Sequence, residues 1–531
     1  MILLGGNDTE NELKTDSETA SESYQDSGSE YQPSDETEDS EEENEDGEFE
    51  EENNEDQLEE NEQTEESVWR EVSGETLQKF VCNKEELNVP LNLSPLQIYR
   101  EIITDDILDL IVNETNKNAK NYNNKWKYMT KGELEHFFAI IIYMGLVKFP
   151  KIADYWSTKF YYKHCFVRHI MSRNRFQSIL RFLHFTDNLT ADKSDRLYKI
   201  QPLVNLLNNR FKELKKPGEV LSIDESMVPF RGRLIIKQYI PNKSSKYGVK
   251  IFKICDEKGY TYDSIMYKGK SETRSKERVS NKVVLQLMGD YLNQGRTLVQ
   301  DNFYNNIELT KTLLSKKTHV VGTLRKRVKY IPKEILTEKG MKKGDIKGKE
   351  KEGIVVANWK DKRAVRFITT RHTINTVDSG KKNRKSETVF KPEAIVFYNK
   401  YKMVIDISDQ ISSYHSVLRR TLRWYHKVAF EYLFGTAVVN ARHLYNASNN
   451  TRIKIGDFRQ KLLTGLLGEF IQEAKSAPKK KHMLQESVEK TRDNRIKRKR
   501  CLGCYENEKA MQGNSKIAAL LLKMLPIKTL I

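Results

Sequence analysis

The stretch between residues 219 and 324 limits the possible folds of this chain more than any other feature. From Glu219 its hydrophobic pattern changes from helical spacing to strand-like alternation, and Glu257-Lys258-Gly259 is a turn signal. Seven segments follow one another in the order strand, strand, strand, helix, strand, helix, strand: 220–224, 249–255, 260–267, 281–292, 297–301, 307–314 and 318–324. This order predicts a mixed α/β domain built on one sheet.

We expect an RNase H-like fold, which has this order of elements and in which the first and fourth strands are neighbours. Asp224 ends the first predicted strand and Asp301 ends the fourth, so their carboxylates should lie side by side. Two carboxylates this close are costly unless a cation lies between them, and their hard oxygen atoms suit Mg²⁺. A third carboxylate would complete a two-metal site that acts on phosphate esters.

Residues 325–393 interrupt this pattern with several glycines and many lysines, and we expect a β-rich insertion there. A short strand at 394–398 should follow, and Asp406 should begin a long helical region that reaches about residue 474. A carboxylate near a helix N-terminus is well placed, and Asp406 is the third candidate metal ligand. Asp409 lies one turn further on the same face. It is either a fourth ligand or a carboxylate without a catalytic role.

Residues 90–215 have helical periodicity and a basic character. Ser94-Pro95 has the form of a helix start, Asp105 opens a second helix, and Thr130 with Glu133 fits a capping box. A further amphipathic helix is expected at 173–185. We interpret 90–215 as an all-helical region for dimerisation and DNA binding, in which most aromatic side chains belong to the core.

The net charge of +15 hides a sharp asymmetry between the two parts of the chain. Residues 1–67 contain 28 Asp/Glu against one Lys, whereas the remainder contains 89 Lys/Arg against 47 Asp/Glu. The acidic segment has too few apolar groups to fold and should be disordered. The basic remainder indicates a polyanionic partner, most simply double-stranded DNA. The five cysteines imply no disulfide framework, and no apolar run is long enough for a membrane span, so we expect a soluble protein without a membrane partner.

Several separated motifs resemble those of the piggyBac-family transposases, in the same order, between about residues 95 and 446. They are Leu221-Ser222-Ile223-Asp224-Glu225, Phe230-Arg231-Gly232-Arg233, Tyr239-Ile240-Pro241-Asn242-Lys243, Lys246-Tyr247-Gly248-Val249-Lys250, Asp301-Asn302-Phe303-Tyr304, Val321-Gly322-Thr323 and Asp406-Ile407-Ser408-Asp409-Gln410. In that family the fold is RNase H-like, with an insertion before the last of three metal-binding aspartates. The resemblance implies that Asp224, Asp301 and Asp406 are catalytic, and that the chain nicks DNA at transposon ends, forms hairpins on them and joins them at TTAA targets.

One motif departs from the family, which usually has glycines just before the third aspartate, where this chain has Lys402-Met403-Val404-Ile405. Bulkier residues there can shift the third ligand. Around the site we expect DNA contacts from a basic and aromatic set: Arg231, Arg233, Lys243, Lys246, Lys250, Arg325, Lys326, Arg327 and Trp424. Any of the cations can instead be ordinary surface charge, and the tryptophan can instead pack in the core.

The C-terminal segment carries two basic clusters, at 479–481 and 495–500, which fit a bipartite nuclear import signal or a DNA-binding tail. Cys501 and Cys504 follow, where the family often has a zinc module, but no Cys or His comes after them. Because a zinc site needs four ligands, we interpret them as the remnant of a truncated or frame-shifted module.

We therefore expect six parts: 1–67 as an acidic tail, 90–215 as the helical region, 216–324 as the first part of the core, 325–393 as the insertion, 394–474 as the completion of the core with C-terminal helices, and 475–531 as the basic tail. The predicted function is a nuclear, homodimeric, Mg²⁺-dependent DNA transposase that acts on transposon ends and target DNA, with an intact catalytic core and a damaged or reduced C-terminal reader. The alternative is a domesticated nuclear DNA-binding protein that keeps the fold without transposing.

Overall fold

The computed structural model describes residues 69–74, 78–82, 84–162, 166–241, 243, 245–269 and 278–468. The chain divides into two units, Met1–Leu467 and Gly468–Ile531, and every element described below belongs to the first. The predictions for the acidic segment 1–67 and for the basic segment 475–531 lie outside the described residues. Among the residues that are described, no helix is long and apolar enough to cross a membrane.

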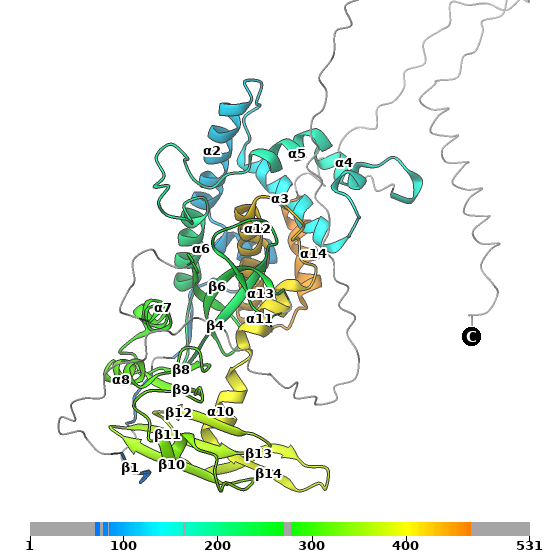
Figure 1. Cartoon of the computed structure of the whole chain (residues 1–531). Helices are drawn as coiled ribbons and strands as arrows, with labels where there is room; N and C mark the ends of the chain where they lie inside the picture. The colour runs from blue at the N-terminus through cyan, green and yellow to red at the C-terminus, as the bar shows by residue number, and fades with distance from the viewer. Residues whose placement is uncertain are drawn as a thin grey trace, which may run out of the picture. The chain divides into compact units, whose positions relative to one another are not determined.

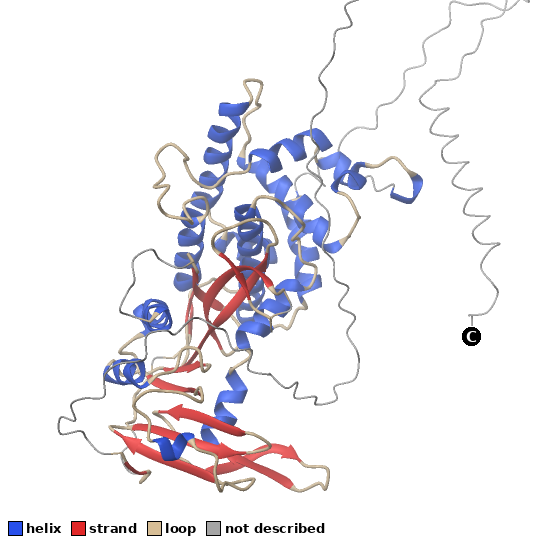
Figure 2. Cartoon of the chain, in the orientation of Figure 1, coloured by secondary structure: helices blue, strands red, loops and turns tan. Residues whose placement is uncertain are grey.

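The first part of the described chain is helical, as its periodicity predicts (Figures 1 and 2). Ser94 caps the first helix through a capping box with Gln97, and Thr130 caps the third by accepting a hydrogen bond from the backbone N–H of Glu133. The elements are α1 (Pro95–Ile102), α2 (Asp105–Tyr122), α3 (Lys131–Leu146), the 3₁₀ turns Ile152–Trp156 and Phe160–Tyr162, α4 (Phe166–Ile170), α5 (Arg173–Phe182) and α6 (Gln201–Leu214). A short antiparallel pair, β2 (Glu86–Leu87) and β3 (Lys215–Lys216), closes this region.

A ten-stranded sheet forms the centre of the described chain. Its middle contains β7, β6, β4, β8 and β9 in that spatial order, in which β4 pairs antiparallel with β6 and parallel with β8. The elements here are β4 (Val220–Pro229), β5 (Lys237–Tyr239), β6 (Tyr247–Asp256), β7 (Thr261–Met266), α7 (Val279–Met288), a 3₁₀ turn (Gly289–Tyr291), β8 (Thr297–Gln300), α8 (Ile307–Ser315) and β9 (His319–Thr323). The first and fourth predicted strands are therefore neighbours.

Asp224 does not end its own strand, and this sequence-based expectation was wrong. Strand β4 is ten residues long, and it pairs with β6 as far as Pro229, opposite Gly248. Proline is tolerated at that position because β8 pairs with β4 only as far as Ile223, so the strand has an open edge beside the proline. The parallel partner β8 is much shorter, and its last register pair is Ile223 with Gln300. Asp224 therefore lies in mid-strand, at the level where the neighbouring strand ends.

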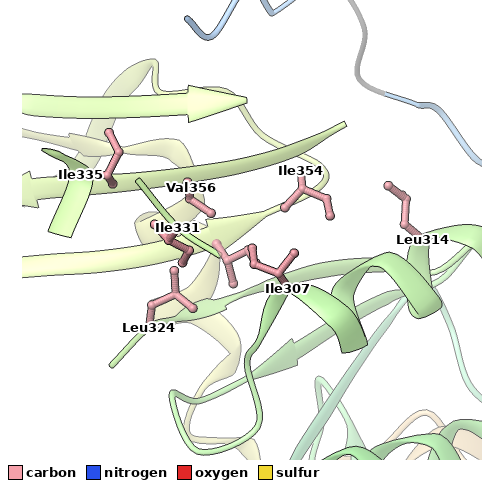
Figure 3. Close-up of a cluster of buried hydrophobic side chains, with 8 residues drawn as sticks. Ile307, Leu314, Leu324, Ile331, Ile335, Ile354 and Val356 are labelled. Carbon is pink, nitrogen blue, oxygen red and sulfur yellow. The ribbon is translucent and has the colours of Figure 1, made fainter. Parts of the chain in front are cut away.

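Most of the insertion does not form a separate sheet, because three of its strands continue the central one. Strand β12 pairs antiparallel with β9, and β11, β10 and finally β1 follow toward the edge. The elements are α9 (Lys333–Leu336), β10 (Ile346–Lys351), β11 (Ile354–Lys360), β12 (Ala364–Thr369) and β1 (Arg70–Glu71). Alternation along β11 places Ile354 and Val356 on one face, in a cluster with α8 that Figure 3 shows, and Ala357 and Trp359 on the other face, against α10. The insertion thus shares its core with the central fold.

The segment after the insertion also differs from the prediction. Residues 394–398 belong to a helix rather than a strand, because Ala394, Ile395 and Tyr398 pack on the hydrophobic cluster of the sheet at helical spacing. Asp406 does not begin the next helix but lies in its first turn. The single long helical region that we expected is divided: α10 (Glu393–Tyr401), α11 (Val404–Ser413), α12 (Trp424–Phe430), a π-helical segment (Glu431–Thr436), α13 (Ala437–Ser448) and α14 (Ile455–Leu466). A separate two-stranded sheet, β13 (Thr376–Lys382) and β14 (Thr388–Pro392), precedes α10.

Candidate active site

Strands β4 and β8 bring Asp224 and Asp301 together. The two strands are parallel and in register up to Ile223 and Gln300, and the residue that follows each of these two in the chain is an aspartate. The backbone N–H of Phe303 donates to Asp301 at 2.8 Å. The amide of Asn305 donates to the backbone carbonyls of Gln300, Asp301 and Thr323, which ties the ends of β8 and β9 together.

Gly322 makes this arrangement possible. A Cβ at this position would lie 2.0 Å from the carbonyl oxygen of Gln300 and 2.2 Å from the side-chain nitrogen of Asn305. Any larger residue would push apart the strand end that holds Asp301. The glycine of the Val321-Gly322-Thr323 motif is therefore required by close packing.

Asp224 and Asp301 are two carboxylates with too little positive charge around them. Burial raises the pKa of Asp224 well above its ordinary value, and the neighbouring carboxylates of Glu225 and Asp301 add to this shift. Burial and Glu225 raise the pKa of Asp301 to about 6. Although burial opposes it, Lys250 lowers the pKa of Glu225, which also accepts a hydrogen bond from Tyr304 at 3.2 Å. A cation placed between Asp224 and Asp301 would relieve the repulsion.

Asp406 joins the site through a lysine. The ammonium group of Lys243 lies 2.9 Å from an oxygen of Asp406 and 3.8 Å from one of Asp224. Burial alone would lower the pKa of Lys243, but the two aspartates raise it above its ordinary value. Lys243 was predicted as a phosphate contact, and here it links two of the three candidate metal ligands instead.

Asp409 is held in a different ion pair. It accepts a hydrogen bond at 2.8 Å from Lys253, whose side chain is 2% exposed and which lies opposite Asp224 in the register of β4 and β6. Burial alone would lower the pKa of Lys253, but Asp409 and the buried Glu431 raise it. Ser412 donates to Glu431 at 2.8 Å. Asp409 therefore neutralises a buried lysine behind α11, and the structure does not bring it to the metal site that we predicted.

A family model described as Transposase IS4 matches residues 94–442, more than half of the chain. The chain belongs to this transposase family. The predicted resemblance to piggyBac-family transposases is confirmed by relatives and by fold. The human PiggyBac transposable element-derived protein 3 is 27% identical over 389 residues, which cover 70% of this chain and 64% of that protein. The human PiggyBac transposable element-derived protein 2 is 27% identical over 369 residues, 66% of this chain and 62% of that protein.

A piggyBac transposase solved by cryo-EM in a synaptic complex with hairpin DNA has a similar fold. Its TM-score is 0.64 at 23% sequence identity, and the match covers 76% of this chain and 88% of that one. At this level of identity the likeness concerns the fold. The chain spans less than two thirds of the length of the two human relatives.

The carboxylates of this chain fit a divalent metal in part. Asp224 and Asp301 offer the hard oxygen ligands that Mg²⁺ prefers, at a place where the nearby cations do not balance the carboxylates. Asp406, however, is engaged by Lys243. Among the residues that the structure describes, no group of three or more Asp, Glu, His or Cys is arranged to hold a metal. Two ligands are thus prepared, and the third depends on the release of Lys243.

The side chains predicted to contact DNA do not form one uniform set. Lys250 and Arg325 lie on the same ring, with their cationic groups 4.6 and 5.5 Å from the centroid of Phe303. Trp424 begins α12, is half-buried and packs near Tyr425. Arg325 is exposed, as are the remaining described cations of the set: Arg231, Arg233, Lys246, Lys326 and Arg327. Cys501 and Cys504 lie outside the part of the chain that the structure describes.

The sequence reasoning did not single out three residues near this site. Glu225 directly follows Asp224, and Tyr304 belongs to the Asp301-Asn302-Phe303-Tyr304 motif, so both could have been selected by their position. Lys253 had only a weak signal, because it shares a face of β6 with the apolar Ile251 and Cys255, which indicates a buried side chain but no partner. Its burial depends on the packing of α11 against β6.

We predict that replacement of Asp301 by asparagine stabilises the protein in the absence of divalent metal. The raised pKa of Asp301, about 6 against an ordinary 3.8, means that its contribution to stability is present below pH 4 and is lost as the pH rises through 6. The asparagine variant should therefore gain up to about 3 kcal/mol at pH 7.5 and nothing at pH 4. Denaturant unfolding at the two pH values measures this difference.

Asp256 provides the matched control. Despite its burial, Lys215 lowers the pKa of Asp256, which also accepts hydrogen bonds from the backbone N–H groups of Lys258 and Tyr260. The same replacement there should destabilise the protein. Addition of Mg²⁺ should stabilise the unmodified chain more than the Asp301 variant. Equal destabilisation by both asparagine variants would contradict the interpretation.

Proposed function

We propose that this chain is a metal-dependent DNA transposase with an RNase H-like core, which cuts DNA at transposon ends and joins those ends to TTAA targets. The observation that carries the proposal is the pair Asp224 and Asp301, adjacent on neighbouring parallel strands and short of positive charge. Family membership and the order of the five central strands, β7-β6-β4-β8-β9, support it. The piggyBac transposase of similar fold was solved in a synaptic complex with hairpin DNA, which supports DNA as the partner here.

In this proposal Asp224, Asp301 and Asp406 hold two Mg²⁺ ions. When bound, the metals would activate a water or a 3′-hydroxyl and stabilise the leaving oxygen. Lys243 neutralises Asp224 and Asp406 in the free protein, and its release would make Asp406 available. The backbone N–H of Phe303 and the hydrogen bonds of Asn305 keep Asp301 oriented. These groups hold the carboxylates in place, which limits the reorganisation needed at the reacting phosphate.

The proposed partner is double-stranded DNA, bound by a homodimer in the nucleus. The exposed cations Arg231, Arg233 and Lys246 follow or precede the strand ends near the site and would contact phosphates. Lys250 and Arg325 flank Phe303, beside Asp301, where a displaced base or a phosphate would meet both charge and an aromatic face. Import factors would recognise the two basic clusters at 479–481 and 495–500.

The direct test is a supercoiled plasmid that carries the genomic sequences flanking the coding region. With Mg²⁺ the full chain should produce nicks that map to the transposon ends, and chelation by EDTA should abolish them. Sequenced joining products should lie at TTAA. A chain that binds these flanks but nicks none of them in Mg²⁺ or Mn²⁺ would overturn the proposal.

One observation favours the alternative, a domesticated DNA-binding protein without transposition. Asp406 is tied to Lys243, and bulky residues rather than glycines precede it at Met403 and Val404. If this pairing is permanent, the third ligand is lost while the fold is kept. Tight DNA binding without cleavage in the plasmid assay, together with no stabilisation by Mg²⁺, is the result that this alternative predicts.

A further inference from the structure

Strands β13 and β14 form a two-stranded ribbon that no other strand of the described chain joins. One face, with Val377, Ser379, Val389 and Lys391, is half-buried, and Lys391 lies 5.7 Å from the ring centroid of Trp359 in β11. The other face is exposed, and Phe390 on it is 60% accessible. Figure 1 shows the loop end of this ribbon extending past β10–β12. The ribbon is thus fixed at its base and free at its tip.

The tip is strongly basic and its charges are not neutralised. Within five residues it carries four exposed cations: Lys381, Lys382, Arg384 and Lys385. None of the four forms an ion pair with a carboxylate of the described chain, although Glu387 lies close in sequence; Glu387 instead accepts a hydrogen bond from Asn383 at 2.8 Å. Elsewhere lysines of the insertion are paired, such as Lys349 with Glu71 and Lys360 with Glu338.

The loop holds its shape through its own hydrogen bonds. The side chain of Asn383 accepts from the backbone N–H groups of Lys385 and Glu387, and Ser379 donates to the carbonyl of Val389. A register shift between Asp378 and Lys382 bends the ribbon just before the tip. The four cations are therefore presented by an ordered turn. Binding would therefore require the four cationic side chains to adopt fixed rotamers, but little further ordering of the loop.

We propose that the tip of the β13–β14 ribbon is a second DNA contact, which binds the phosphate backbone of a duplex outside the catalytic site. A two-stranded ribbon is narrow enough to lie in the major groove, and Lys, Arg, Ser and Asn are the side chains that contact phosphates. Four unpaired cations on one turn match a regular array of phosphates. The contact is sequence-independent, since these cations would meet the backbone rather than base edges.

The ribbon leads in the chain to the helix that carries Asp406. Strand β14 runs directly into α10 at Pro392, and only Lys402 and Met403 separate α10 from α11, which carries Asp406. Helix α10 packs against both strands of the ribbon. A duplex held at the tip would therefore be aligned with the helix that supplies the third carboxylate; this consequence rests on the proposed transposase function.

The test is the salt dependence of binding to a duplex without transposon ends. Replacement of all four tip cations by glutamine should make the negative slope of log K against log salt shallower by about 3 to 4, because each phosphate contact contributes about −0.9. A charge-conserving variant with Lys381, Lys382 and Lys385 changed to arginine and Arg384 to lysine should keep the slope. A charge-matched control neutralises four exposed lysines on α7, on α8 and just after α8: Lys282, Lys311, Lys316 and Lys317. It should change the slope by less than about 1.

Two results would overturn the proposal. An unchanged slope in the quadruple glutamine variant would show that the tip touches no phosphate. A rise in DNA affinity would show that the tip instead binds the acidic segment 1–67 of this chain, whose 28 carboxylates are the obvious competitor. Failure of the catalytic proposal is distinguishable, since replacement of Asp224 should remove cleavage and keep the slope. The tip variant should keep cleavage at saturating DNA and low salt.

Discussion

Replacement of Asp224 by alanine is expected to reduce nicking of the transposon ends by on the order of 10²–10³-fold or more, without loss of folded protein. The carboxylate lies in mid-strand, is mostly buried and lacks enough positive charge around it, so its removal relieves repulsion. Active-site groups commonly lower the stability of the folded protein, since they are kept for activity. The measurement is the nicking rate in Mg²⁺ beside the denaturant midpoint of the same preparation.

The control for this variant is the exposed Asp457, which lies in the first turn of α14. Its replacement by alanine should leave the nicking rate unchanged. Nicking that survives in the Asp224 variant would refute the assignment of this carboxylate as a metal ligand. A loss of nicking that is matched by a large fall in stability would indicate a structural role instead.

The second large effect is expected at Lys253, where replacement by methionine should destabilise the protein by about 3–5 kcal/mol. The methionine keeps the apolar stem but leaves Asp409 and the buried Glu431 without their common cation. Replacing Asp409 by asparagine as well should restore part of the loss, because one unpaired charge is removed. A double-mutant cycle by chemical denaturation measures the coupling between Lys253 and Asp409.

This cycle also decides the role of Asp409. If it only neutralises Lys253, the asparagine variant alone should lose stability while Mg²⁺ still stabilises it as much as the unmodified chain. If Asp409 is instead a metal ligand, Mg²⁺ should stabilise its asparagine variant less than it stabilises the unmodified chain. The control pair is Lys311 with Glu352, which has a similar 3.0 Å separation but is exposed. Replacement of Lys311 by methionine should cost less than about 1 kcal/mol.

Most of the central sheet could be predicted because its signals are local. The alternation of Leu221 and Ile223 against Asp224 and the two strand–helix repeats that follow are read directly from neighbouring residues. Two features could not be predicted, because they depend on contacts between distant parts of the chain. The length of β4 beyond Asp224 depends on its pairing with β6, and the helix at 393–401 contains the aromatic residues typical of a strand. It is helical because Ala394 and Ile395 pack on the sheet.

The sequence by itself determined the order of the strands and helices between residues 219 and 324, the resemblance to a transposase family and the placing of Asp224 beside Asp301. Short-range periodicity and the connection rules of parallel strands suffice for this. Only the tertiary structure decided which cations meet the carboxylates. Lys243 is 163 residues from Asp406, and Lys253 is 156 residues from Asp409. Contacts over such separations leave no trace in local pattern, because each lysine alone resembles any other charged residue on a strand or turn.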